Sequence, residues 1–203
     1  MYGTAPPSVF LVFCNPGAGG DDALAHWYME VHGPDALDNG SFHALHRYRA
    51  LGDYEARFLA VWEGDYASMA EASAYITPRA TQLRGAGRVT DDMTVMWATM
   101  EFRRPSAAPT PITDVGTLTL VRGDVPDHAP TGSTSRYGDL TFVEQADPPD
   151  VVVPRWAGIG KSGMPPHGPY RGVFREPTEP IDVEPLPPGT WVSHWEPVGS
   201  LVQ

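Results

Sequence analysis

The chain has 203 residues, of which 41% are apolar and 10% aromatic, and its formal net charge is −11. This apolar content can build a buried core, which excludes a wholly disordered chain. The negative charge repels phosphate backbones and anionic membrane surfaces, so we expect no nucleic-acid partner and no membrane partner. No stretch approaches the roughly 20 apolar residues of a membrane helix, so a cytoplasmic protein is expected.

Common cofactor, metal and nucleophile motifs are absent. Cys14 is the one cysteine, which excludes an intramolecular disulfide and a multi-cysteine zinc site. Residues 160–162 read Gly-Lys-Ser, but Arg155 stands where a Walker loop needs glycine. No zinc-binding pair is found among the histidines, and His43 and His46 should point to opposite faces of a strand. Without a Gly-x-Ser-x-Gly motif no serine hydrolase is implied, and we expect neither a metal nor a cofactor.

Proline divides the chain, since 5 of the 22 prolines precede residue 105 and 17 follow it. Helix interiors exclude proline, so the second half should hold strands and irregular segments. We therefore predict a domain over residues 1–104, a linker over 105–113 and a proline-rich, β-rich region over 114–203. That region either donates strands to the first-half barrel as a degenerate second half or wraps over a homodimer. Its strand candidates are residues 116–125, 135–145, 170–176 and 190–198.

The first half has the periodicities of a mixed α and β domain. Asp21 or Asp22 can cap a helix whose apolar positions repeat with a period of 3.6, and Gly33–Pro34 should end that helix. Thr77–Pro78 resembles the start of a further short helix after one that begins near Met69. The apolar face of the first helix comprises Leu24, Trp27, Tyr28 and Val31. The strands are predicted at residues 8–14, 42–51, 56–63 and 92–103.

This order is βαββαβ, the split βαβ or ferredoxin-like pattern, and the fold class is α+β. Helices on one side of a four-stranded sheet leave the other face bare, and a bare apolar face must be buried. We therefore expect either a homodimer or a barrel that the second half closes within one chain.

One stretch carries a family resemblance. Residues 27–35 read Trp-Tyr-Met-Glu-Val-His-Gly-Pro-Asp, Gly40 follows, and Arg47–Tyr48 lies on the next strand. Residues 8–104 thereby resemble the EthD-like families of the dimeric α/β-barrel superfamily. The resemblance implies an apolar cavity between sheet and helices, and members that share it include cofactor-free monooxygenases, polyketide cyclases, isomerases and haem enzymes. It also implies a general acid or base role for His32.

Physical chemistry supports the same residue. An imidazole with an ordinary pKa near 6.5 takes and returns protons near neutrality. The alternative is that His32 only caps the C-terminal end of a helix, where a cation meets the negative end of the dipole.

The remaining candidates lie on predicted strands. Alternation along residues 42–51 puts His46 and Tyr48 on one face with Phe42, and Arg47 on the other. His46 or Tyr48 could polarise a substrate oxygen, although such rows are commonly packing. Trp27, Tyr28, Trp62, Trp97 and Arg47 are candidate substrate-binding residues, with core packing as the alternative for the two strand tryptophans.

The function that follows is a cofactor-independent enzyme of proton-transfer chemistry, such as a lyase, dehydratase, cyclase or isomerase. Its expected substrate is small and apolar, an aromatic or polyketide-like carbonyl or phenolic compound. A cofactor-free monooxygenase is the nearest alternative, a haem enzyme a further one, and a non-catalytic ligand-binding protein the alternative from another class.

Overall fold

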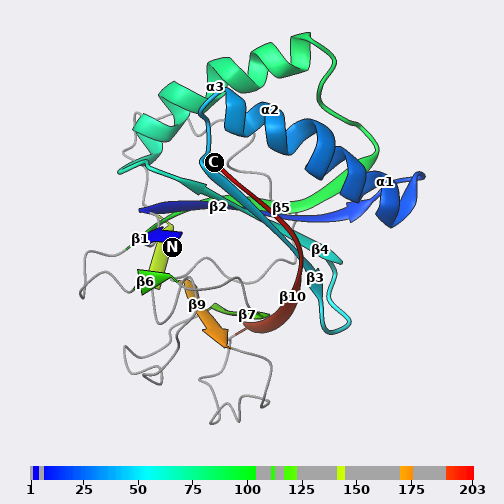
Figure 1. Ribbon diagram of the computed structural model, residues 1–203. Coiled ribbons are helices and arrows are strands. Elements are labelled where there is room, and N and C mark those ends of the chain that lie inside the picture. The colour runs from blue at the N-terminus through cyan, green and yellow to red at the C-terminus, as the bar shows by residue number, and fades with distance from the viewer. Residues whose placement is uncertain are drawn as a thin grey trace.

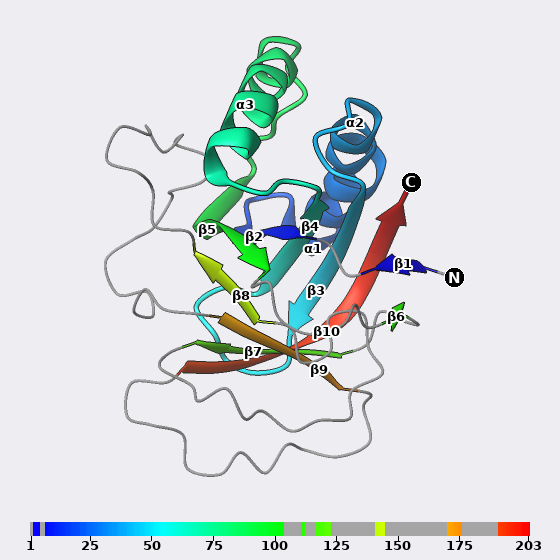
Figure 2. The ribbon, with the colours of Figure 1, turned by 90° about the vertical axis from the view of Figure 1, so that its left-hand side faces the viewer.

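A computed structural model gives the arrangement of the chain, and Figures 1 and 2 show it from two sides. The sheet of the first half is antiparallel, and α-helices cover one of its faces. This agrees with the predicted α+β class and with the order βαββαβ. The structure describes residues 2–4, 7–103, 111–112, 117–122, 141–144, 170–175 and 191–203.

The strands lie close to the predicted segments. In the first half they are β2 (Ser8–Pro16), β3 (Ala44–Ala50), β4 (Phe58–Gly64) and β5 (Met93–Arg103). Each strand candidate of the second half overlaps a strand, and the last strand extends beyond its predicted end at residue 198. The strands are β7 (Thr117–Arg122), β8 (Thr141–Glu144), β9 (Tyr170–Arg175) and β10 (Trp191–Val202). The short strands β1 (Tyr2–Thr4) and β6 (Pro111–Ile112) pair with each other.

The eight longer strands form a closed barrel in the order β10-β3-β4-β2-β5-β8-β9-β7. β10 joins the two halves, because Trp191–Trp195 pair with β7 while the rest of β10 pairs with β3. The described strands therefore close the barrel within one chain. A homodimer stays a prediction, since a single chain does not test it. Within the described residues, no helix has both the length and the apolar character needed to cross a membrane.

The first helical segment continues past its predicted end. It consists of α1 (Gly20–His26), a π-helical turn η1 (Trp27–His32) and α2 (Gly33–Asp38). Its first residue follows Gly19, which makes no side-chain cap, so the predicted cap by Asp21 or Asp22 is wrong. Both carboxylates instead lie in the first turn, where the helix dipole favours them. The predicted end at Gly33–Pro34 is also wrong, because Pro34 occupies the first turn of α2, where it sacrifices no hydrogen bond.

The second helix is longer than predicted. α3 spans Met69–Gly85, and the Ser68 hydroxyl accepts a hydrogen bond from the Glu71 N–H at its start. Pro78 lies inside α3 and does not begin a separate helix. The helix tolerates it because Pro78 and Ala74, the residue four positions earlier, are exposed, so water can hydrate the carbonyl that loses its partner.

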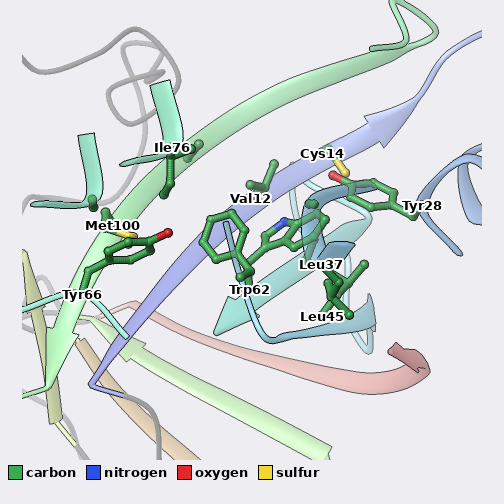
Figure 3. Close-up of a cluster of buried hydrophobic side chains, with 14 of the residues drawn as sticks. Val12, Cys14, Tyr28, Leu37, Leu45, Trp62, Tyr66, Ile76 and Met100 are labelled. Carbon is green, nitrogen blue, oxygen red and sulfur yellow. The ribbon is translucent and has the colours of Figure 1, made fainter. Parts of the chain in front are cut away.

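The sheet separates two buried clusters. Side chains that point into the barrel include Val9, Leu11, Tyr48, Leu59 and Trp195. Those that point toward the helices include Val12, Cys14, Leu45, Trp62 and Met100, and Figure 3 shows them in one cluster with Tyr28 and Ile76 of the helical segments. Because strand residues alternate between faces, each of β2, β3 and β4 contributes to both clusters. The candidate chemistry is divided between these two sides.

Candidate functional site

An apolar cavity of about 170 Å³ lies between the sheet and the helices. Figure 2 shows α2 and α3 side by side above the strands, and residues of both helices line the cavity. Its aromatic residues are Phe10, Trp27, Tyr28, Phe42 and Trp62, and most of its other lining residues are aliphatic. The resemblance implied a cavity in this place.

His32 is the ionisable imidazole in the cavity wall. Its ring stacks on Trp27 with centroids 4.4 Å apart and planes 9° from parallel, and it meets Trp62 edge-on at 5.2 Å. Nδ1 is buried and has no hydrogen-bond partner among the described residues. Burial lowers the pKa of His32 from 6.5 to about 4, and nearby Asp35 opposes this shift only in part. The imidazole is therefore neutral at pH 7.

The π-helical turn explains why Trp27 and His32 meet. In an α-helix of 3.6 residues per turn, two residues five positions apart point to different sides. In η1 the hydrogen bonds span five residues, as the bond from the Gly33 N–H to the Tyr28 carbonyl shows, so residues five apart point more nearly to the same side than they do in an α-helix. The wider turn thus places His32, instead of Val31, toward the sheet. A periodicity of 3.6 could not have predicted this.

His46 and Tyr48 do not share the cavity with His32. Both are fully buried, and Tyr48 belongs to the cluster inside the barrel, whereas Leu45 of the same strand packs under the helices. The predicted grouping of Phe42 with them is wrong. β3 begins only at Ala44, and Phe42 lies in the preceding turn, where its N–H bonds to the Ala36 carbonyl, so strand alternation does not extend to it.

Arg47 lies beneath Tyr28 and is not a cavity-lining residue. Its side chain is 2% exposed, and its guanidinium carbon is 4.7 Å from the centroid of the Tyr28 ring. One of its terminal nitrogens has no hydrogen-bond partner among the described residues. Burial lowers the pKa of Arg47 and raises that of neighbouring Cys14 to about 11, so the thiol, which lies beside Tyr28 in Figure 3, is protonated. This thiol therefore acts as the buried apolar group that the sequence predicted.

Of the predicted aromatic residues, Trp27, Tyr28 and Trp62 reach the cavity. The side chain of Trp97 lies outside the described residues. Phe10 and Phe42 also line the cavity and were not predicted to do so, although the alternation of β2 offered a signal for Phe10.

A second polar group lies inside the barrel. Glu63 is fully buried, with one carboxylate oxygen 3.2 Å from Nε2 of His46 and the other 3.4 Å from Nε2 of His43. His43 reaches Asp65 at 3.4 Å, and Nδ1 of His46 is 2.9 Å from the Ser200 hydroxyl. His43 and His46 were predicted to point to opposite faces of one strand. His43 precedes β3, so the alternation of side chains along β3 does not apply to it. Sequence reasoning missed Glu63 and Ser200, although a glutamate within the apolar run of β4 was a signal.

The described residues contain no group of three or more histidine, cysteine or acidic side chains arranged to hold a metal ion. Together these features define an α+β protein with an antiparallel sheet and an apolar, histidine-bearing cavity under its helices. No protein-family model, curated protein or solved structure matches the chain. The likeness to the EthD-like families is therefore a resemblance of motifs within residues 8–104.

Proposed function

We propose that this protein is a cofactor-independent enzyme that transfers a proton to or from a small aromatic carbonyl or phenolic compound, with His32 as general base and acid. One observation carries the proposal: a neutral imidazole in the wall of an aromatic cavity, with a buried nitrogen that has no hydrogen-bond partner in the described part of the chain. Neutral imidazole is the form that accepts a proton. The resemblance to EthD-like proteins assigns the same residue the same role.

Cavity size narrows the substrate. A cavity of about 170 Å³ is close to the roughly 150 Å³ of an engineered protein cavity that binds benzene. The aromatic edges and faces of Trp62, Phe42 and Tyr28 suit one planar ring. We therefore propose a substrate with a single ring, in place of the larger polyketide-like compounds that the sequence also allowed.

The stack on Trp27 supports chemistry at His32. When His32 takes a proton from the substrate it becomes a cation, and the face of an indole ring attracts a cation. Return of that proton to another substrate atom completes an isomerisation, cyclisation or elimination. Deprotonation of an electron-rich phenol would instead prepare it for direct reaction with oxygen, which is the monooxygenase variant of this proposal.

A second candidate is binding without chemistry. A pKa of about 4 makes His32 a weak base, and His46 and Tyr48, which were expected to polarise the substrate oxygen, lie on the other face of the sheet. A hydroxyl-bearing ring would then simply donate a hydrogen bond to the imidazole.

The test compares His32→Ala with a matched control, His26→Ala, which removes an exposed histidine from the same helical segment. Phenol and toluene are titrated against each protein while the fluorescence of the cavity tryptophans is recorded. We expect phenol to bind about 10-fold more tightly than toluene to wild type and to His26→Ala, and this preference to vanish in His32→Ala. An unchanged preference in His32→Ala overturns the site.

Turnover separates the two candidates. Purified protein is incubated with a library of phenols and aryl ketones in deuterated water, and mass spectrometry detects exchange or conversion. An enzyme loses activity in His32→Ala while its circular dichroism is retained. Binding without any turnover in wild type supports the second candidate and contradicts the first.

A further inference from the structure

Ser200 and His46 are cross-strand neighbours on the inner face of the barrel. β10 and β3 pair antiparallel, with Ser200 directly opposite His46. The Ser200 hydroxyl lies 2.9 Å from Nδ1 of His46, within hydrogen-bond reach, although the two residues are 154 positions apart. His46 is fully buried, whereas Ser200 is exposed, so this contact lies at the boundary between the barrel interior and solvent.

The other ring nitrogen of His46 meets a buried carboxylate. Nε2 is 3.2 Å from Oε1 of Glu63, and both side chains are fully buried. The second oxygen of Glu63 contacts His43, which holds the carboxylate in place from the opposite side. The contact between Nε2 and Glu63 has an ion-pair distance without hydrogen-bond alignment, so the carboxylate acts on the imidazole through its charge. That charge favours a proton on Nε2, which leaves Nδ1 to accept the hydroxyl proton of Ser200.

We propose that Ser200, His46 and Glu63 form a nucleophile–base–acid triad that hydrolyses small carboxylic esters where β10 continues along β3 past its described pairing with β7. The arrangement has the order required for acyl transfer, in which a third group orients the base and the base contacts the nucleophile. Such triads occur on unrelated folds and are recognised by their geometry. The absence of a Gly-x-Ser-x-Gly motif therefore excludes only the one fold that uses this motif. The site is independent of the His32 cavity, which lies on the other face of the sheet.

The backbone offers one donor for the oxyanion. The Gln203 N–H bonds to the His43 carbonyl, and hydrogen-bonded pairs alternate along an antiparallel ladder. Three positions along the ladder, Ser200 and His46 therefore form a non-hydrogen-bonded pair. The Ser200 N–H then points away from β3. On that side the described pairing of β10 with β7 ends at Trp195, so this N–H lies at a strand edge beside the nucleophile.

The steps balance without a cofactor. The Ser200 oxygen bonds to the ester carbonyl carbon while Nδ1 of His46 takes the hydroxyl proton, and Glu63 stabilises the imidazolium. The bond to the alcohol oxygen breaks, and His46 gives that oxygen its proton. Water then attacks the acyl-serine, His46 takes and returns one proton, and the carboxylic acid leaves with Ser200 restored.

The experiment uses the whole protein and two probes, a fluorophosphonate that labels activated serines and p-nitrophenyl acetate. We expect one adduct by intact mass, located on the peptide that contains Ser200, and none in Ser200→Ala. Ester hydrolysis should fall at least about 100-fold in Ser200→Ala and His46→Gln, and about 10-fold or more in Glu63→Gln. Because Ser200 is exposed, Ser200→Ala should fold normally.

Glu101→Gln is the matched control. Glu101 is also fully buried and, like Glu63, lies opposite Val9 on a neighbouring strand, but its carboxylate accepts a hydrogen bond from Thr99. Labelling and hydrolysis in Glu101→Gln should stay within about 2-fold of wild type. The proposal is overturned if wild type is not labelled at Ser200, if His46→Gln is labelled at the wild-type rate, or if Glu101→Gln loses as much activity as Glu63→Gln.

Discussion

The indole of Trp27 covers one face of the His32 imidazole, with the two ring planes 9° apart. This contact keeps water from the imidazole and contributes to the burial that lowers its pKa to about 4. The same contact is favourable to the imidazolium once a proton has been taken up. The stack therefore contributes to the burial that keeps His32 neutral at rest, and it would stabilise the protonated form.

Replacing Trp27 with leucine should expose this imidazole. We expect the pKa of His32 to rise by about one unit or more, toward its ordinary value of 6.5, because the desolvation is partly relieved. NMR titration of the His32 ring protons measures this, with exposed His26 as the internal reference resonance. A pKa that stays near 4 would assign the desolvation to Trp62 and the sheet instead.

Stability should depend on pH through His32. Between pH 6.5 and about 4 the unfolded chain binds a proton at this histidine that the folded chain does not, so the free energy of unfolding falls as the pH falls through this range. The loss attributable to His32 is on the order of 2 kcal/mol, discounted for its partial exposure. Below about pH 4 the loss should level off.

Urea unfolding of wild type and His32→Leu at pH 7 and pH 4.5 isolates this effect, because the other titrating groups are common to both proteins. Lowering the pH from 7 to 4.5 should reduce the free energy of unfolding of wild type more than that of His32→Leu. A difference that does not change with pH contradicts the assigned pKa.

Gly33 lies close to Leu201 of β10. A Cβ added here would lie 2.4 Å from the Tyr28 carbonyl oxygen and 2.5 Å from Cδ1 of Leu201. Gly33→Ala should therefore lower the free energy of unfolding by about 2 kcal/mol or more, as overpacking does. Gly85→Ala, at the end of α3 with open space around it, should change it by less than about 1 kcal/mol. Equal effects in urea unfolding would mean that the π-helical turn is free to shift.

Arg47 is a buried cation whose guanidinium packs on the faces of Tyr28 and Phe58, and one of its nitrogens has no hydrogen-bond partner within the ranges that the structure describes. Methionine has a similar length and no charge, so Arg47→Met should leave stability unchanged or raise it. Arg47→Ala should cost about 2–4 kcal/mol because it leaves a cavity. The control is Arg49→Met, which removes an exposed ion pair on the same strand and should cost less than about 1 kcal/mol. A large loss in Arg47→Met, measured by urea unfolding, would show that the guanidinium has a required partner.

Local sequence determined most of the elements. The β-branched and aromatic run near the N-terminus predicted β2, and the concentration of proline after residue 105 predicted strands rather than helices there. Both signals act through backbone preferences of neighbouring residues. The same is true of Ser68, whose hydroxyl caps α3.

Tertiary structure decided which of these residues meet. The stacking of His32 on Trp27 depends on a π-helical turn, which the packing of Gly33 against Leu201 accompanies. The contacts of His46 with Glu63 and Ser200 arise only when β3 pairs with β4 on one side and with β10 on the other. Strand alternation gives the face of each side chain, but the register between distant strands is fixed by turns, bulges and the burial of apolar faces. A chemical site that spans strands 154 residues apart is therefore visible only in the folded chain.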